Sequence, residues 1–381
     1  MTERLSSLLH DEADDLSIPS APTGAVLAEG RKRVRQRRVG LASMAAVAII
    51  GAGALVQATH GQDRAAVVLD PAAAPNANEW AVAQGSTVHL GSGATVDVPG
   101  QIKSMYYTSA GTLVRVGASP YTDGPHTNGS SYWLAHPDGT LSDPRISLGD
   151  RVPGTDPTLP YLAYVDKGSD ARHWTVKIRD VRTGDVVREI PIEGTFTWGG
   201  WAAPPAALSG DHVYVGVDGT LLDVLWRTGQ VAKTSVPEHM PETRGGREVV
   251  SYDKSGKIQV VDMVSGQVIK TLTFDPNVGF YWYPQLSTDG THLVMLPSAD
   301  CTGGTCTYEG QPTRVIDLAT GKSQTTSLEY GAFGWSATGR LLMVDGHTVK
   351  SCDPDTMKCD ATPVELDGSG PIRVSGNDNE S

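Results

Sequence analysis

The stretch TVKIRDVRTGDVVREIPI, at positions 175–192, decides the fold class because its pattern recurs along the chain. Apolar and polar side chains alternate over residues 176–179, which is the two-residue period of a β-strand. Asp180 ends this strand, and a tight turn around Gly184 leads into a second apolar stretch. The segment therefore predicts a strand, a turn and a second strand.

The same phrase recurs at residues 257–274 and 313–328, and in looser form at 132–148, 213–236 and 341–366. The intervals between the turn glycines of successive copies are 45, 45, 37 and 55 residues, for Gly139, Gly184, Gly229, Gly266 and Gly321. A period near 40–45 residues with three or four strands per unit is typical of a β-propeller. The insertion that carries Cys301 and Cys306 accounts for the longer last step.

The two ends of the repeat region predict how the ring closes. Residues 80–99 resemble a unit without its innermost strand, and residues 370–376 form one lone strand near the C-terminus. Joined together they make one composite blade, which would leave no open sheet edge. Six complete units lie between them: 102–148, 151–192, 195–236, 240–274, 280–328 and 331–366.

We therefore expect an all-β, seven-bladed propeller over residues 80–376. Six blades are the alternative, because the innermost strands of units 151–192 and 240–274 are poorly marked. The repeat shape resembles extracytoplasmic WD40-like or TolB-like propellers over this whole range. No Gly-His…Trp-Asp pair is repeated, so the resemblance does not extend to the WD40 hydrogen-bond network.

A membrane anchor is predicted ahead of the propeller. Residues 39–56 contain no charge, and a transmembrane helix over residues 39–58 would come close to the thickness of a bilayer. Six basic side chains lie in the eight positions before it, from Arg31 to Arg38. The positive-inside rule then places residues 1–38 in the cytoplasm and the later residues outside, in a single-pass protein of the cell membrane.

A cleaved export signal is the alternative interpretation of the same segment. Residues 36–41 resemble a twin-arginine signal, and residues 56–58 loosely resemble a cleavage site. The length of the apolar run favours an uncleaved anchor. A linker rich in Pro and Ala follows at residues 59–79, and residues 377–381 are a short polar tail.

The cytoplasmic tail contains a short amphipathic helix by its pattern. Its apolar stripe lies on one face of such a helix and needs a protein or membrane surface to cover it: Leu5, Leu8, Leu9 and Leu16. An unattached, solvated tail is the alternative.

Residues 8–15 (LLHDEADD), residues 26–30 (VLAEG) and the basic run before the span resemble the N-termini of single-pass proteins of high-GC Gram-positive bacteria. Some of those proteins are membrane partners of extracytoplasmic-function sigma factors. The resemblance is confined to the tail and the predicted span, and it implies that the tail acts as an anti-sigma segment. The tail contains no Cys, so the HxxxCxxC zinc motif of some anti-sigma factors is absent from it.

Charge and cysteine usage describe the outer domain. After residue 38 the chain carries 24 basic and 37 acidic residues, a balance that argues against nucleic acid as a partner. All four cysteines are on this side, and their spacing favours two local disulfides over metal ligation or free thiols. The expected pairs are Cys301 with Cys306 and Cys352 with Cys359.

Catalytic motifs are weak. The chain has no GxSxG elbow and no HExxH motif, and its ten His residues are scattered. Asp353, Asp355 and Asp360 do not have the spacing of a calcium loop, and Asp180, Asp262 and Asp317 occupy equivalent turn positions that suit capping. We therefore predict no catalytic residue, no cofactor and no bound metal.

Aromatic residues precede or enter the predicted innermost strands, where they would surround one mouth of the central channel. Packing between blades is the alternative for each ring. The predicted ligand-binding residues are Tyr107, Trp198, Trp201, Tyr281, Trp282 and Trp335.

These features lead to a sensor or scaffold that binds an extracytoplasmic ligand or protein and meets a cytoplasmic partner through its tail. A propeller enzyme, such as a hydrolase, lyase or cyclase, is the second hypothesis, and a structural envelope protein is the third.

Overall fold

The computed structural model describes residues 79–120, 130–149, 151–196, 201–252, 257–273, 282–297, 300–302, 305–307, 313–328, 332–366, 368 and 370–376. The predicted cytoplasmic tail, the predicted span and all but the last residue of the linker lie outside this part of the chain. Within the described residues, no helix has the length and apolarity needed to cross a membrane.

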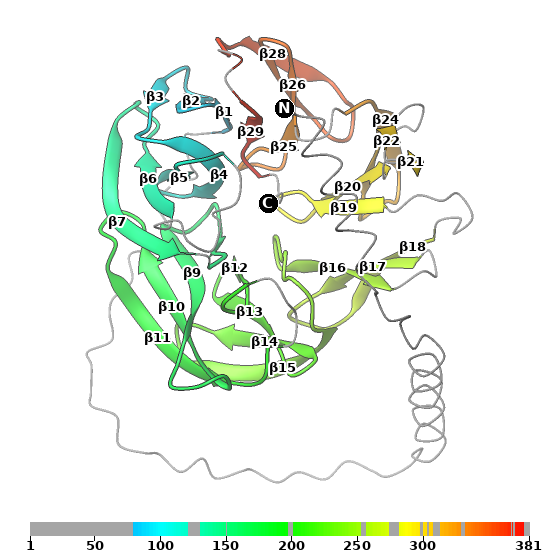
Figure 1. The fold of residues 1–381 in the computed structure, drawn as a ribbon. Coiled ribbons are helices and arrows are strands. Elements are labelled where there is room, and N and C mark those ends of the chain that lie inside the picture. The colour runs from blue at the N-terminus through cyan, green and yellow to red at the C-terminus, as the bar shows by residue number, and fades with distance from the viewer. Residues whose placement is uncertain are drawn as a thin grey trace, which may run out of the picture. The chain divides into compact units, whose positions relative to one another are not determined.

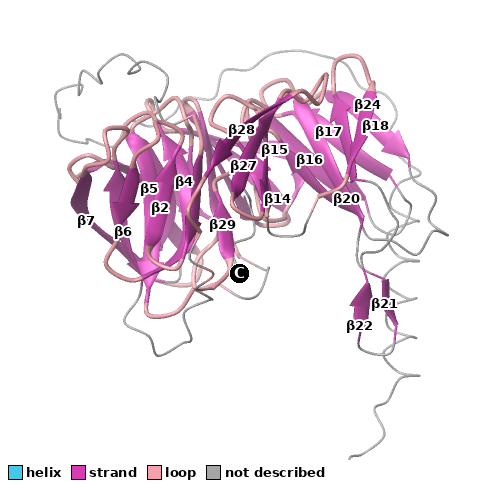
Figure 2. Cartoon of the chain, turned by 90° about the horizontal axis from the view of Figure 1, so that it is seen from above, coloured by secondary structure: helices cyan, strands magenta, loops and turns pink. Residues whose placement is uncertain are grey.

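Seven antiparallel sheets follow one another around a ring, which confirms the seven-bladed propeller over the six-bladed alternative (Figure 1). Blades 1 to 7 are numbered in chain order from the first described strand. The first strand of a unit lies at the centre of the ring and the last lies at its rim. In the view turned by 90°, the strands run between two faces at which the turns gather (Figure 2).

Blade 1 contains β1 (Ala81–Gln84), β2 (Thr87–Leu90), β3 (Thr95–Asp97) and β29 (Ile372–Val374). Blade 2 contains β4 (Gln101–Thr108), β5 (Gly111–Gly117), β6 (Ser130–Ala135) and β7 (Leu141–Gly149). Blade 3 contains β8 (Gly154–Thr155), β9 (Tyr161–Lys167), β10 (His173–Asp180) and β11 (Val186–Glu193). Blade 4 contains β12 (Ala206–Ser209), β13 (His212–Val217), β14 (Thr220–Leu225) and β15 (Gln230–Pro237).

Blade 5 contains β16 (Arg247–Tyr252), β17 (Lys257–Asp262) and β18 (Val268–Thr273). Blade 6 contains β19 (Trp282–Leu286), β20 (His292–Pro297), β23 (Thr313–Asp317) and β24 (Ser323–Thr326). Blade 7 contains β25 (Phe333–Trp335), β26 (Leu341–Asp345), β27 (Thr348–Cys352) and β28 (Cys359–Pro363). A separate hairpin of β21 (Asp300–Thr302) and β22 (Thr305–Thr307) is the insertion that stretches the repeat.

The C-terminal strand closes the ring as the sequence predicts. In the register of β29 against β1, Val374 lies opposite Val82. Ser375 Oγ donates a hydrogen bond of 2.9 Å to the carbonyl of Ala81. The side chain of Gln84 is also tied to this end of the chain, because its Nε2 donates to the carbonyl of Gly370. Blade 1 is therefore built from both ends of the described chain.

The blades bury the alternate residues that the repeat pattern marks as apolar. In β10, Trp174, Val176 and Ile178 are buried, whereas the residues between them are partly exposed. The side chains of blades 3 and 4 form one core cluster, in which the rings of Tyr161 and Trp226 meet edge to face at 5.3 Å. The propeller core thus lies between neighbouring sheets.

The aspartates at equivalent repeat positions cap turns, as expected from their spacing. Asp180 Oδ1 accepts a hydrogen bond from the backbone N–H of Arg182, and Asp262 Oδ1 accepts one from that of Ser265. Asp317 Oδ1 accepts from the N–H of Ala319 in the same manner. These carboxylates are occupied by local backbone, which explains their recurrence without any acid–base chemistry.

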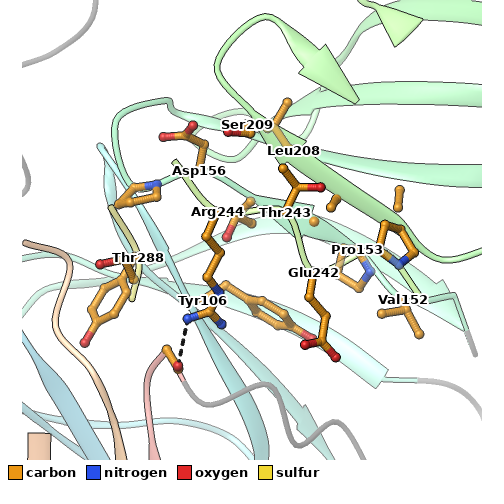
Figure 3. Close-up of a pocket in the computed structure, with 18 of the residues that line it drawn as sticks. Tyr106, Val152, Pro153, Asp156, Leu208, Ser209, Glu242, Thr243, Arg244 and Thr288 are labelled. Carbon is orange, nitrogen blue, oxygen red and sulfur yellow. Dashed lines mark hydrogen bonds between the residues drawn. The ribbon is translucent and has the colours of Figure 1, made fainter. Parts of the chain in front are cut away.

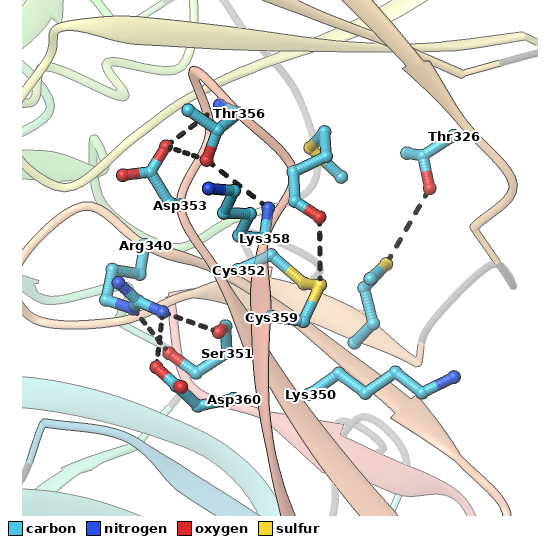
Figure 4. The surroundings of a disulfide bond; sticks show 12 residues. Thr326, Arg340, Lys350, Ser351, Cys352, Asp353, Thr356, Lys358, Cys359 and Asp360 are labelled. Carbon is cyan, nitrogen blue, oxygen red and sulfur yellow. Dashed lines mark hydrogen bonds and ion pairs between the residues drawn. A yellow bond between two sulfur atoms is a disulfide. The ribbon is translucent and has the colours of Figure 1, made fainter.

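The disulfide between Cys352 and Cys359 is confirmed (Figure 4). It joins residues that are paired directly across β27 and β28, and the turn between them is capped by Asp353, which accepts from the N–H groups of Asp355 and Thr356. The backbone of β21 and β22 also places Cys301 directly opposite Cys306. The side chains of that second pair lie outside the description.

The two units with poorly marked innermost strands are the two exceptions to the regular blade. In blade 3 the innermost strand, β8, has two residues. In blade 5 the described strands begin with β16, which corresponds to the second strand of the other units, and the segment Met240–Gly245 occupies the chain position of the innermost strand. This irregular segment forms one wall of the candidate site.

Candidate functional site

A cavity lies at the centre of the ring, against the innermost strands of blades 2, 3 and 4 and the segment Met240–Gly245 (Figure 3). The cavity has a volume of about 120 Å³. Its apolar lining includes Met105, Val152 and Pro153, and its polar lining includes Asp156 and Glu242. A space of this size fits a small ligand or the end of one side chain.

The irregular path of Met240–Gly245 follows from its residues. Pro241 has no N–H to give to a sheet, and Gly245 and Gly246 both have positive φ angles, of 52° and 73°. A Cβ atom on Gly245 would overlap the carbonyl of Asp289 in the neighbouring blade. The chain therefore turns back on itself, and the single bridge between Arg244 and Arg247 is the only pairing that the segment makes with β16 among the described residues.

A buried carboxylate holds this segment in place. The side chain of Glu248 is 1 % exposed and accepts hydrogen bonds from His239 Nε2 at 3.0 Å and from the backbone N–H of Glu242 at 3.2 Å. The hydroxyl of Thr243 donates to the other carboxylate oxygen. Burial lowers the pKa of His239, but the hydrogen bond and the charge of Glu248 raise it by more, so this pKa lies above its ordinary value.

Glu242 is the one acidic group of the cavity lining whose carboxylate has no hydrogen-bond partner among the described residues. The residue is half-buried and is part of the cavity lining (Figure 3). Burial first, and the charge of Glu248 second, raise its pKa to about 7 against the smaller opposing effects of Arg244 and His239. Near neutral pH this carboxyl is therefore present in both protonation states.

Arg244 lies beside Glu242 but is directed at backbone. Its Nη1 donates hydrogen bonds to the carbonyls of Leu286, at 3.1 Å, and Gly376, at 3.0 Å. Burial lowers its pKa to about 10, which leaves the guanidinium protonated at neutral pH. The bonds tie the cavity wall to blade 6 and to the end of the closing strand.

The opposite wall is rigid because it is hydrogen-bonded and closely packed. Asp156 Oδ2 accepts from the N–H of Gly210 at 2.7 Å, and its Oδ1 accepts from the N–H and the hydroxyl of Thr158. A Cβ atom on Gly154 would lie 2.5 Å from the carbonyl of Ala206, so β8 and β12 approach each other as only glycine allows. Asp156 is thus an already satisfied carboxylate, unlike Glu242.

Tyr107 completes the lining at β4. The residue is 3 % exposed, and burial raises the pKa of its phenol well above the usual range. Its hydroxyl oxygen has no partner with hydrogen-bond geometry, although Ser375 and the carbonyl of Ala81 lie near it. The hydroxyl of Tyr107 is therefore buried, whereas Glu242 lines the cavity with a carboxylate that has no hydrogen-bond partner among the described residues.

This arrangement suits binding by preorganised groups. Among the described residues, no cluster of three or more His, Cys, Asp or Glu side chains could hold a metal ion. His239 directly precedes the lining segment Met240–Gly245, and its two ring nitrogens are hydrogen-bonded to Pro237 and Glu248. The functional groups of the site are the titratable carboxylate of Glu242, the buried phenol of Tyr107 and the hydrogen-bonded guanidinium of Arg244.

The predicted aromatic residues have different places. Tyr107 lines the cavity. Trp335 is completely buried in the core between blades 6 and 7, where it packs with Val294 and Phe333, and it is not part of the cavity lining. Trp201 is half-buried and is also not part of that lining.

The remaining predicted site residues fall outside what the structure describes. Trp282 lies in β19, but its side chain is not described, and Trp198 and Tyr281 lie in gaps of the description. The leucines of the predicted partner-binding stripe, Leu5, Leu8, Leu9 and Leu16, precede the first described residue. Their proposed roles remain predictions.

Sequence reasoning did not identify Glu242, Arg244 or Asp156 as site residues. One signal pointed toward the first two, namely the missing strand pattern at the start of unit 240–274. A stretch without strand pattern at the position of an innermost strand lines the channel with irregular backbone instead of a strand. Pro241 and the Gly245-Gly246 pair mark that stretch in the sequence.

No protein-family model and no curated protein sequence matches the chain. Solved structures with a similar course of the chain include apo AztD from Citrobacter koseri, with 13% identity and a TM-score of 0.45 over 78% of this chain and 99% of that one. The Cps50 (Swd1) β-propeller domain of Myceliophteria thermophila has 13% identity and a TM-score of 0.42 over 74% and 97%. TolB from Acinetobacter baumannii has 14% identity and a TM-score of 0.38 over 77% and 64%.

Proposed function

We propose that this chain is a membrane-anchored binding protein whose propeller lies outside the cell and holds a small ligand, or the end of a protein side chain, in the central cavity. The observation that carries the proposal is the carboxylate of Glu242, which has no described partner in a cavity with rigid walls. Carboxylates enclosed in a protein are normally hydrogen-bonded, and the half-buried carboxylate of Glu242 is not, which suggests a missing partner. The acidic balance of the outer residues agrees with a partner other than nucleic acid.

The anchoring half of the proposal rests on the sequence. Residues 39–58 are apolar enough to span a bilayer, and the basic run from Arg31 to Arg38 favours a cytoplasmic N-terminus. The leucine stripe of the tail would then meet a cytoplasmic partner, such as a sigma factor, so that the protein acts as a sensor or scaffold across the membrane. The span carries no ionisable group to switch, so a signal would pass by movement, clustering or cleavage of the span.

One observation favours an enzyme as the second candidate. A carboxyl with a pKa of about 7 is well suited to general acid–base catalysis near neutral pH. A hydrolase or lyase would need further acidic or His groups facing the same space. Among the described lining residues the other carboxylate, that of Asp156, is bonded to Gly210 and Thr158, so binding is the better supported function.

The binding half is tested with the full-length chain in detergent or nanodiscs. The protein is incubated with an extract of small molecules from the cells that make it, washed, heated, and the released compounds are identified by mass spectrometry. Ala207 lines the cavity and is small, so Ala207→Leu should fill the space and abolish retention. Ala232→Leu on the exposed face of β15 in the same blade is the matched control. Equal retention by both variants would exclude the cavity as the binding site.

The signalling half is tested by deleting residues 1–30 and comparing the proteins that co-purify from the cytoplasm. Loss of one or more partners supports the sensor model. An unchanged set of partners would contradict it and leave the binding function without a cytoplasmic output.

A further inference from the structure

We propose that the group recognised in the cavity is a primary alkylammonium, seated on the carboxylate of Glu242. The inference rests on the proposed binding function and names the chemistry of its ligand. The alkylammonium can belong to a free amine or to a lysine side chain of another protein, and both present the same head group to the cavity.

The first argument is the distribution of hydrogen bonds among the carboxylates. Glu248 accepts from His239, Thr243 and the N–H of Glu242, and Asp156 accepts from Gly210 and Thr158. The carboxylate of Glu242 accepts none among the described residues. An ammonium group supplies three donors, which is what an ionised and partly desolvated carboxylate lacks.

The second argument is charge. The groups that act on Glu242 are Glu248, Arg244 and His239. The guanidinium of Arg244 is directed at the carbonyls of Leu286 and Gly376, and the imidazole of His239 is bonded to Glu248 and Pro237. Among the described residues, neither cation forms an ion pair with Glu242. The ionised carboxylate of Glu242 therefore has its acceptor oxygens open to one further cation.

The third argument is the shape and polarity of the lining. Tyr106 and Tyr107 of β4 are part of the lining, and Met105, Val152 and Pro153 are apolar. Such walls suit the methylene stem of an amine, and an aromatic ring adds attraction for its charged end. The space of about 120 Å³ admits an ammonium head group with a short stem.

Ionisation of Glu242 makes the binding depend on pH in a defined direction. The carboxyl has a pKa of about 7, and only its ionised form attracts the ammonium group. Affinity should therefore rise about tenfold between pH 6 and pH 8, because the ionised fraction rises about tenfold. A neutral or anionic ligand would not follow this profile.

The experiment uses the full-length chain in nanodiscs and isothermal titration calorimetry. The probes are n-butylammonium chloride, 1-butanol as its neutral analogue, and sodium butyrate as its anionic analogue, at constant ionic strength. We expect n-butylammonium alone to bind, about tenfold more tightly at pH 8 than at pH 6. Glu242→Gln, which keeps the shape and removes the charge, should abolish this binding. Glu365→Gln, at an exposed carboxylate without a described partner, should leave it unchanged.

A second arm distinguishes the source of the head group. N-acetyl-lysine-N-methylamide carries the same ammonium on a peptide-like body, and tighter binding of this probe than of n-butylammonium identifies a protein side chain as the ligand. The reverse order identifies a free amine. Equal binding of n-butylammonium and 1-butanol, or unchanged binding to Glu242→Gln, would overturn the inference.

The failure of this inference differs from the failure of the proposed function. A compound from the extract that is retained by the protein, lost in Ala207→Leu and not a cation would overturn the alkylammonium while the binding cavity stands. If neither that compound nor n-butylammonium depends on Ala207, both proposals fail.

Discussion

The Nε2 of His239 lies 3.0 Å from Oε1 of Glu248, a carboxylate whose side chain is 1 % exposed. His239 precedes the segment Met240–Gly245 and Glu248 follows it, so the pair joins the two ends of the stretch that stands in for the innermost strand of blade 5. Thr243, in the middle of the stretch, bonds to the same carboxylate. One buried acid thus fixes a cavity wall that no described sheet supports.

The charge on His239 should make this support depend on pH. Its pKa in the folded protein is raised above the ordinary value, so the stabilisation is complete below about pH 6.5 and is lost as the pH rises through the folded value. We expect His239→Gln to lower the free energy of unfolding by about 2 kcal/mol near pH 6 and by less at pH 9. Urea unfolding measures both values.

Glu242 titrates in the same pH range and would add its own pH dependence to the free energy of unfolding. The effect of His239 is therefore measured in a protein without that carboxyl. The comparison is therefore made between Glu242→Gln and the double variant Glu242→Gln, His239→Gln. A loss of stability that is equal at pH 6 and pH 9 would show that the bond contributes through geometry alone.

Glu242 itself should cost the protein stability at neutral pH. Burial raises its pKa from 4.5 to about 7, so the ionised form is disfavoured in the folded state and stability falls as the pH rises from 4.5 to 7. Glu242→Gln removes this loss, and we expect a gain on the order of 2 kcal/mol at pH 8 after allowance for water in the cavity. At pH 4.5 and below, the variant and the parent should unfold alike.

Urea unfolding of parent and variant across pH 4.5 to 8 gives the test. Glu365→Gln serves as the control for removing an exposed charge, and its profile should run parallel to that of the parent. A parallel profile for Glu242→Gln would mean that this carboxyl titrates as an ordinary exposed glutamate.

The fold could be predicted because the sequence signals of each blade lie close together in the chain. The strand, the capping aspartate and the turn glycine all lie within a single copy such as 175–192. Their alternation identifies the buried face without knowledge of the neighbouring sheet. Blade 1 required one non-local step, the pairing of residues 370–376 with the first strands, and the edge that would otherwise stay open supplied the reason.

The site could not be predicted in the same way, because it is assembled from separate blades. Tyr107, Asp156 and Glu242 come from three different units, and no local pattern brings them together. The predicted aromatic residues show that sequence context alone does not decide whether a side chain faces the channel or the core between blades. Trp335 has the sequence context of a channel residue, yet it packs on Val294 of the preceding blade, and only the sheet-to-sheet arrangement decides between the two faces.

Gly184 and Gly229 occupy the same turn in blades 3 and 4, with φ angles of 78° and 80°. A Cβ atom on Gly184 would overlap the carbonyl of Pro144 in blade 2, whereas on Gly229 the nearest atom is 3.8 Å away, at the end of Arg188. We expect Gly229→Ala to cost about 1 kcal/mol for the left-handed backbone, and Gly184→Ala about 2 kcal/mol more for displacing blade 2. Thermal unfolding of both variants compares the costs, and equal values would exclude tight contact between these blades.

The disulfide between Cys352 and Cys359 closes a short loop, with a sequence separation of 7. It restricts the unfolded chain only modestly, so the double variant Cys352→Ala, Cys359→Ala should lose about 2 kcal/mol. Treating the parent with a reductant should produce the same loss in urea unfolding, and the double variant should not respond further unless the other cysteine pair contributes. No change in either experiment would mean that the hairpin of β27 and β28 is held by its backbone and by the Asp353 turn alone.

The pairing of β29 with β1 makes the ring depend on its last strand. Val374 is 5 % exposed and packs in one cluster with Trp80 and Val82, so a chain that ends after Gly370 loses both core contacts and the bonds across β1. We expect this truncation to lower the unfolding midpoint strongly and to cause association through the open edge of β1, measured by urea unfolding and size-exclusion chromatography. A chain that ends after Gly376 keeps the strand and should match the full-length protein.

Adding a peptide of residues 370–381 to the shorter chain should restore its stability, because the missing strand needs only to pair with β1. If the truncated chain unfolds like the parent without the peptide, blade 1 is stable with three strands and the closure contributes nothing.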